Sequence, residues 1–425
     1  MKLVSHARSD AGTTRTRNED YFLTAPELGL YIVCDGLAVE AGGDIASRTA
    51  AAVIQQQVAE NFSQVQSFTD TPEGRAKVTR LVNEAIQIAC RAIYAQSGTE
   101  KHSRSATTMS LLLFLGQKAL LAHVGDTRVY LKRGHRIDQL TEDHTYRTEM
   151  MKKGVLSAEQ MRGHQFGAVV TRALGQQEVT PVDTLYLDVL SGDTFVLCTD
   201  GLSRYLERPV DLRGFLTDAD PANTTASLVN FANDRGGRDN VTAIVIRVES
   251  DEGDRLSETD RSVSIDMMFG ALRGLPLFQY LDSREIMQLV QISKVRTLEP
   301  GDVAYSEAQR DDSLYITLDG RLSLWRAGTK IAELQRGTSF GETALLSARP
   351  RMTTVKAEEP SKVLLIPRTS LFELLRSQPE LGVRVLFSLG RGLSERLDAA
   401  SLQLAAEHLP VPAPIFSDLP FTLSS

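Results

Sequence analysis

Apolar runs that begin or end at an aspartate recur in the first 250 residues of the chain. The runs cover residues 30–34, 120–124, 194–199 and 241–248. The aspartates beside them are Asp35, Asp126, Asp200 and Asp239. Short, nearly continuous apolar runs predict buried strands. One Asp-Gly pair after a strand is typical of a hairpin turn, but the recurrence predicts carboxylates gathered at one end of a sheet.

Helical periodicity alternates with these strands. Residues 44–58 and 78–93 carry apolar side chains every three or four positions, which predicts two amphipathic helices. Residues 109–115 and 119–124 predict a hairpin of two buried strands. This order of helices and strand pairs predicts an α+β domain in which helices pack on antiparallel sheets.

A different pattern follows the polar, charge-rich stretch at residues 251–266, which is predicted to be a linker. Residues 267–292 have helical spacing, and brief strands separated by glycine turns continue to residue 366. This pattern predicts a small β-barrel or jelly roll with flanking helices up to about residue 406. The tail, residues 407–425, is predicted to be extended or disordered. The predicted domains are therefore residues 1–250 and 267–406.

Composition narrows the classes of partner. A chain of 425 residues is too long for one ordinary core. The formal net charge of -7 argues against affinity for nucleic acid or anionic membranes. The three cysteines have no paired spacing, which predicts neither a disulfide framework nor a zinc site. No apolar run is long enough to span a bilayer, and the start lacks a signal-like apolar core. We expect a cytoplasmic protein.

Ionised carboxylates crowded at one sheet end repel one another and need cations between them. All-oxygen ligation favours magnesium or manganese over zinc. Two such ions, roughly 3.5–4 Å apart, can activate a water for attack on phosphorus or a carbonyl carbon. Glu19 is a plausible further ligand, and Arg15 is a candidate for gripping a phosphate in two bonds. The lone histidines His144 and His164 are expected to be structural.

The N-terminal half carries a series of short motifs with a common resemblance. They are RTRNED at 15–20, VCDG at 33–36, VGDTR at 124–128, LTEDH at 140–144, TRALG at 171–175, CTDG at 198–201 and GGRDN at 236–240. In order and spacing they resemble the metal-dependent, type 2C protein phosphatases. The resemblance covers residues 1–250 and implies an αββα sandwich that hydrolyses phosphoserine and phosphothreonine with two or three Mg²⁺ or Mn²⁺ ions.

The resemblance also implies roles for individual residues. Asp35 would bridge two metal ions, and the carbonyl of Gly36 together with Glu19 would complete the second site. Asp200 and Asp239 would hold the first ion.

Further residues would act around these ions. Asp20 would orient a metal-bound water, and Asp126 matches a residue that holds a looser third ion with Asp239. Arg15 would grip the substrate phosphate, and Asn240 would support Asp239.

Some positions depart from the family pattern. Leu37 stands where methionine or histidine is common, and so it cannot act as the general acid assigned to a histidine in some members. Ala106 and Ala168 stand where glycine and asparagine are common. The departures concern rate and substrate fit, because every expected oxygen ligand is present.

In the C-terminal half, residues 340–355 resemble the phosphate-binding cassette of the cyclic nucleotide-binding domain. A glycine that opens a short helix can free backbone N–H groups for an anionic oxygen. By resemblance, Arg351 would neutralise the phosphate of cyclic AMP or cyclic GMP, and Glu342 would hold the ribose 2′-hydroxyl. Met352 is longer than the family's usual small residue. The nucleotide-contacting set would be Gly341, Glu342, Ala344, Arg351, Met352 and Thr353.

These features favour a phosphoprotein phosphatase that is tuned by a cyclic nucleotide. One alternative is a signalling adaptor that binds phosphorylated partners without useful turnover. The other is a working phosphatase whose barrel binds no nucleotide.

Overall fold

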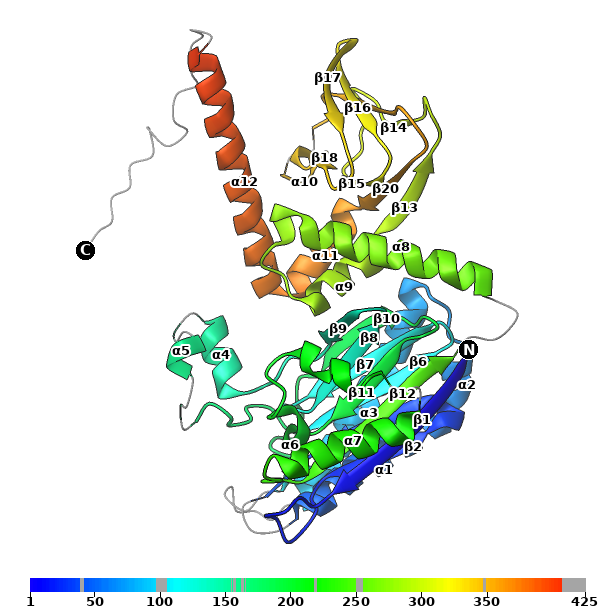
Figure 1. Ribbon diagram of the computed structural model, residues 1–425, viewed down its shortest axis with the longest axis vertical. Coiled ribbons are helices and arrows are strands. Elements are labelled where there is room, and N and C mark those ends of the chain that lie inside the picture. Colours follow the sequence, from blue (N-terminus) through cyan, green and yellow to red (C-terminus); the bar gives the residue numbers. More distant parts are fainter. Residues whose placement is uncertain are drawn as a thin grey trace, which may run out of the picture. The chain divides into compact units, whose positions relative to one another are not determined.

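The structure is a computed structural model (Figure 1) that describes residues 1–38, 42–96, 105–153, 155, 158–161, 164, 166–217, 220–249, 255–346 and 349–406. It separates into two compact units, Met1–Val263 and Ser264–Ser425. None of the helices in the described ranges combines the length and apolar character needed to cross a membrane.

Two five-stranded antiparallel sheets form the centre of the first unit. One has the order β1 (Lys2–Asp10), β12 (Val241–Glu249), β11 (Thr194–Cys198), β8 (Arg128–Arg133) and β9 (Arg136–Gln139). The other has the order β10 (Asp183–Asp188), β7 (Lys118–Val124), β6 (Met109–Leu115), β3 (Leu30–Cys34) and β2 (Tyr21–Ala25). Ring contacts between Phe114 on β6 and Phe195 on β11, at 5.5 Å, join the two sheets.

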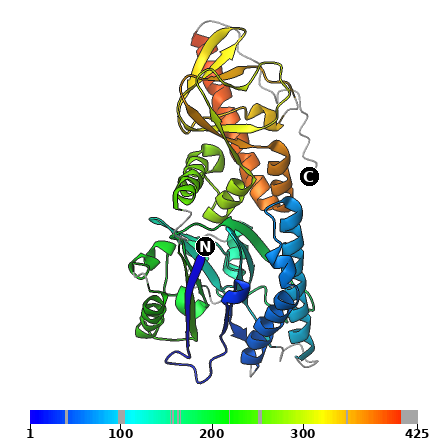
Figure 2. The ribbon, with the colours of Figure 1, turned by 90° about the vertical axis from the view of Figure 1, so that its right-hand side faces the viewer.

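Helices cover the outer faces of both sheets (Figure 2). Helices α1 (Gly43–Glu60) and α3 (Pro72–Gln96) pack on the sheet that contains β3, and α7 (Pro221–Asp234) packs on the other. Every residue of β3 is buried because both faces of its sheet are covered, which explains its continuous apolar run. The predicted αββα sandwich is thereby confirmed.

Short elements connect the layers of this unit. They are η1 (Pro26–Leu28), β4 (Gly36–Leu37), α2 (Phe62–Gln66), β5 (Ala106–Thr107), α4 (Tyr146–Lys152), α5 (Ala158–Met161), α6 (Asp200–Ser203) and η2 (Pro209–Gly214). Strands β4 and β5 pair with each other and place Gly36 beside Thr107.

Two four-stranded antiparallel sheets form the second unit. One has the order β13 (Lys294–Leu298), β20 (Ser361–Ile366), β15 (Leu314–Asp319) and β18 (Ser339–Phe340). The other has the order β14 (Val303–Tyr305), β19 (Thr354–Ala357), β16 (Leu322–Arg326) and β17 (Thr329–Leu334). Helix α8 (Arg255–Gly274) contains the boundary between the two units. The other helices are η3 (Pro276–Phe278), α9 (Ser283–Ile292), α10 (Thr343–Leu346), α11 (Arg368–Ser377) and α12 (Pro379–Ala406). The predicted small β domain with flanking helices is confirmed.

The helices before this β domain differ from the predicted ones. Helix α8 begins at Arg255, inside the stretch 251–266 that was predicted to be a polar linker. Its buried residues Ile265, Phe269 and Leu272 recur at helical spacing, and the helix continues back from them through polar sequence. The predicted helix 267–292 is interrupted after Gly274, since Pro276 opens a separate 3₁₀ turn. The predicted disordered tail, residues 407–425, lies outside the described residues.

Candidate active site

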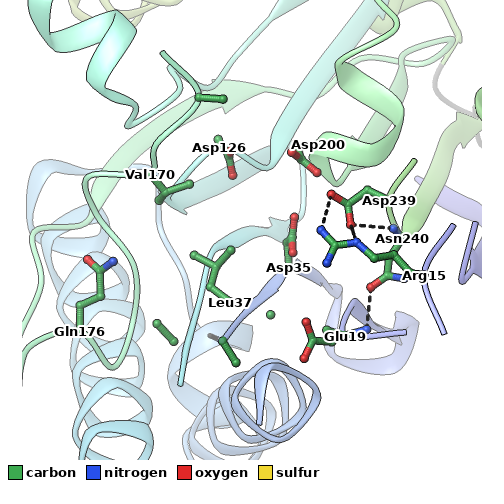
Figure 3. A pocket seen from close by; sticks show the side chains of 14 residues that line it. Arg15, Glu19, Asp35, Leu37, Asp126, Val170, Gln176, Asp200, Asp239 and Asn240 are labelled. Carbon is green, nitrogen blue, oxygen red and sulfur yellow. Dashed lines mark hydrogen bonds and ion pairs between the residues drawn. The ribbon is translucent and has the colours of Figure 1, made fainter. Parts of the chain in front are cut away.

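The strand-end aspartates come from both sheets and meet at one cavity. Asp35 follows β3 and Asp126 follows β7, whereas Asp200 follows β11 and Asp239 precedes β12. Their carboxylates point into the same space, of about 540 Å³ (Figure 3). The lining also includes Arg15, Glu19, Gly36, Leu37, Ala38, Ala106, Ala168, Val170, Gln176 and Asn240. The structure therefore brings together the residues that four separate strand ends supply.

Backbone packing at Gly36 explains why the Asp-Gly pair stands here. A Cβ atom on Gly36 would lie 2.2 Å from the carbonyl oxygen of Gly43 and 2.6 Å from that of Glu19. The Gly36 N–H also donates to the Glu19 carbonyl at 3.2 Å. Only glycine lets the loop that carries Glu19 approach Asp35 so closely.

Asn240 ties the N-terminal loop to the strand start that carries Asp239. Its Oδ1 accepts from the Glu19 N–H at 2.8 Å, and its Nδ2 donates to the carbonyls of Ala11 and Arg17 at 3.0 and 2.8 Å. Its backbone N–H donates to Asp239 Oδ1 at 3.1 Å. Asn240 thus holds the segment with Glu19 beside Asp239.

Asp20 is buried beside the cavity and is absent from its lining. Its Oδ2 accepts from the hydroxyls of Thr199 and Thr242 at 2.8 and 2.7 Å. Its Oδ1 is buried without a hydrogen-bond partner, and so is Oδ1 of Asp126. A bound cation or a water would satisfy such an oxygen.

Burial and mutual repulsion disfavour the ionised form of these acids. Burial, together with the charges of Asp20 and Asp200, raises the pKa of Asp35 well above its usual value. Burial raises the pKa values of Asp20 and Asp126 to about 7. It also raises the pKa of Glu19. Acids that repel one another and keep unpartnered oxygens are a donor set that suits hard divalent cations.

Two arginine side chains form ion pairs with acids of this cavity. Arg15 contacts Asp239 through Nε at 3.0 Å and Nη2 at 3.1 Å. Arg204 contacts both Asp200 and Asp239. Among the described residues, no three His, Cys, Asp or Glu side chains are arranged around a common metal position. Arg204 was not predicted, although its position four residues after Asp200 on a helical turn is a usable signal.

His144 supports the turn that carries Asp126. It is buried, and its Nδ1 accepts from the Gly125 N–H at 3.0 Å, while Nε2 lies 3.5 Å from Asp183 Oδ2. The expectation that His144 is structural matches these contacts, but sequence reasoning missed its position directly behind the site. His164 instead lies against Tyr146, away from the cavity lining.

In the second unit the predicted cassette residues Gly341 and Arg351 lie together. Arg351 is buried, and its guanidinium donates to the carbonyls of Gly341 and Ser313 at 2.9 and 2.6 Å. It also lies 3.2 Å from Asp311 Oδ2 and 4.2 Å from the ring centre of Tyr305. A Cβ on Gly341, whose φ is +78°, would lie 2.5 Å from Arg351 Nη1. Arg351, the residue expected to bind the phosphate, is therefore already paired with groups of the protein itself.

The other cassette residues are more open. Met352 is 61% exposed, so much of its side chain faces solvent. Glu342 and Thr353 are partly exposed. The side chain of Ala344 and the loop residues Val39 and Glu40 lie outside what the structure describes.

A two-sheet sandwich with clustered acids at one sheet end defines the class of metal-dependent protein phosphatases, and comparison with known proteins agrees. Residues 10–239 match the family model for protein phosphatase 2C. The chain belongs to the protein phosphatase 2C family. Residues 295–378 match the family model for the cyclic nucleotide-binding domain.

Individual relatives match the N-terminal unit. Protein phosphatase PhpP of Streptococcus pneumoniae serotype 2 (strain D39 / NCTC 7466) is 30% identical over 251 residues, which cover 58% of this chain and 98% of the relative. The crystal structure of the Mycobacterium tuberculosis serine/threonine phosphatase PstP/Ppp has a TM-score of 0.51 at 28% identity, covering 58% and 99% of the two chains. The S. agalactiae serine/threonine phosphatase has a TM-score of 0.52 at 26% identity, covering 58% and 100%.

Proposed function

We propose that the N-terminal unit hydrolyses phosphoserine and phosphothreonine in phosphorylated protein substrates, with Mg²⁺ or Mn²⁺ at the acid cluster. The observation that carries this proposal is the convergence of Asp35, Asp126, Asp200 and Asp239 on one cavity. Unpartnered oxygens on Asp20 and Asp126 support it. Similarity to relatives named serine/threonine phosphatases supports the substrate class.

In this proposal each acid has a role at one of the metal ions. Asp35, Glu19 and the Gly36 carbonyl would hold one ion, and Asp35, Asp200 and Asp239 the other. Asp126 with Asp239 would hold a third. When bound, such ions supply an activated water and neutralise charge that develops on the phosphate.

Other residues of the cavity bind the substrate phosphate or form the cavity wall. Arg15 lies at the open rim with its side chain 54% exposed, and its guanidinium matches two phosphate oxygens. Leu37 and Ala38 line the cavity with apolar surface. Asp20, held by two threonine hydroxyls, keeps a fixed acceptor beside Asp35.

The test is metal dependence of turnover on a phosphothreonine peptide. Treatment with EDTA is expected to reduce hydrolysis by at least about 10³-fold, because several kcal/mol of charge stabilisation are removed. Excess Mn²⁺ or Mg²⁺ should restore it. Turnover that persists in EDTA would reject the proposal, and peptide binding without turnover in Mn²⁺ would favour the adaptor alternative.

We also propose that the second unit binds cyclic AMP or cyclic GMP at residues 341–353 and thereby tunes the phosphatase. The family match and the pairing of Gly341 with Arg351 support this. The carboxylate of Asp311, 3.2 Å from Arg351, competes with a ligand phosphate for the guanidinium. The nucleotide can change turnover only if it binds two conformations with different affinity.

Asp311 is therefore expected to weaken nucleotide binding. Asp311→Asn removes the competing charge and should tighten binding of the preferred nucleotide by about tenfold, since charge-assisted bonds to a guanidinium are worth roughly 1.5–3 kcal/mol. Calorimetric titration of the full chain with each nucleotide measures this, and Asp312→Asn, on the exposed neighbour, is the matched control. No binding by the parent and by Asp311→Asn would favour the nucleotide-blind alternative.

The proposed location is the cytoplasm. Cys34, Cys90 and Cys198 are all buried free thiols, which supports a reducing compartment.

A further inference from the structure

Arg204 bridges two acids that different elements supply. Asp200 opens α6 after strand β11, and Asp239 precedes β12. Arg204 follows the last residue of α6, and its Nη2 contacts Asp200 Oδ2 and also lies 3.1 Å from Asp239 Oδ2. Its Nε donates to the Asp200 carbonyl at 3.3 Å. A planar guanidinium held at three points is a fixed cation and not a surface charge that swings freely.

The oxygens that Arg204 contacts are those assigned to a metal ion. Arg15 also contacts Asp239 through two nitrogens, so both carboxylate oxygens of Asp239 already face a guanidinium. The two arginines differ in reach. Among the described residues, the acid that Arg15 pairs with is Asp239, and the Arg15 side chain is 54% exposed, whereas that of Arg204 is 34% exposed. Arg204 is the one that spans both acids.

A guanidinium and a divalent ion compete for these acids. Arg204 satisfies part of the negative charge with one positive charge and two oxygen contacts. A divalent ion beside it would meet like-charge repulsion over a few ångströms, in a half-buried site where screening is weak. Binding the ion thus requires either displacement of Arg204 or tolerance of this repulsion.

We propose that Arg204 is an internal cation that a divalent ion must displace from Asp200 and Asp239, so that Arg204 sets a low metal affinity. This inference rests on the proposed metal-dependent function. As a consequence, the metal site fills at a higher free concentration of the ion than it would if the acids carried no internal cation.

The test is Mn²⁺ titration of the full chain by isothermal calorimetry. Arg204→Met keeps the side-chain length and removes the charge, and it is expected to bind Mn²⁺ at least about tenfold more tightly than the parent. Arg208→Met is the matched control, because Arg208 is four residues away, has a side chain that is 75% exposed and lies 3.7 Å from its partner Asp211. Its Mn²⁺ affinity should equal that of the parent.

Arg204→Lys gives a second measure, because a lysine keeps the charge but replaces the planar guanidinium, which Arg204 also anchors through Nε, by a compact and strongly hydrated ammonium. A smaller tightening of about threefold is expected, and this variant decides the question if the methionine variant does not fold in EDTA. Unchanged or weaker Mn²⁺ binding in the folded variants would overturn the inference. Absence of Mn²⁺ binding by the parent and every variant would instead reject the proposed metal site itself.

Discussion

Replacing Asp35 by asparagine is expected to abolish phosphopeptide hydrolysis and, at the same time, to stabilise the metal-free protein. Asp35 lies between the other acids, and its ionised form is opposed first by burial and then by Asp20 and Asp200. Asparagine keeps the shape and removes that charge. The loss of activity should reach at least about 10³-fold, because the acid proposed to hold both metal ions is removed.

The gain in stability has a defined pH dependence. A carboxyl whose pKa is raised in the folded state destabilises that state once the pH exceeds the unfolded pKa, and the cost is complete above the folded pKa. The parent in EDTA should therefore lose stability as the pH rises from about 4 toward 8. Asp35→Asn lacks the carboxyl that causes part of this loss. Its free energy of unfolding is therefore expected to exceed that of the parent by about 0.5–2 kcal/mol at pH 8, and the difference should shrink toward pH 4.

Three measurements distinguish this from a general structural effect. They are thermal unfolding in EDTA at both pH values, the stabilisation by Mn²⁺, and turnover of a phosphothreonine peptide. Mn²⁺ should stabilise the parent and leave Asp35→Asn almost unchanged. Asp234→Asn, at an exposed acid of the same unit, should behave as the parent in all three. A metal-free Asp35→Asn protein that is less stable than the parent at pH 8 would contradict the prediction.

Removal of Asp193 is expected to cost about 3–5 kcal/mol of stability, a large effect away from the cavity. Asp193 precedes β11 and pairs with Arg133 at the end of β8 by two bonds, at 2.9 and 2.7 Å. Their side chains are only 1% and 6% exposed. Arg133 also donates to the Asp188 carbonyl at 2.7 Å, and Asp193 accepts from the Leu190 N–H. The pair joins neighbouring strands, one of which leads to Asp200.

Asp193→Ala removes the carboxylate that neutralises the buried Arg133 charge, and this loss is the source of the cost. Replacing both residues by apolar ones of similar volume, Arg133→Met with Asp193→Leu, removes the buried charge and should recover most of the loss. Glu249→Ala breaks the exposed pair with Lys2 in the same sheet and should cost less than about 1 kcal/mol.

Urea unfolding followed by far-UV circular dichroism measures these differences. The single tryptophan, Trp325, belongs to the second unit, and its fluorescence would report on the wrong part of the chain. A double variant as unstable as Asp193→Ala would show that the cost comes from lost shape and not from an unpaired charge.

Much of the N-terminal architecture could be predicted from local sequence. Strand β3 and helix α3 are recognisable because burial of a whole strand, or of one helix face, demands apolar side chains at fixed intervals. Periodicity did not predict the first part of α8, where the helix begins within charge-rich sequence. Charge-rich sequence is compatible with a solvated helix as well as with a linker, and periodicity cannot choose between them.

The sequence by itself determined the sandwich, the β domain and the set of acids that stand at strand ends, because periodicity and turn residues are local properties. Only the tertiary structure decided that Arg204 bridges Asp200 and Asp239. It also decided that Arg351 is bonded to Asp311 within its own barrel. The reason is physical: an ion pair depends on distances of a few ångströms between side chains from different elements, and such distances exist only after the elements have packed.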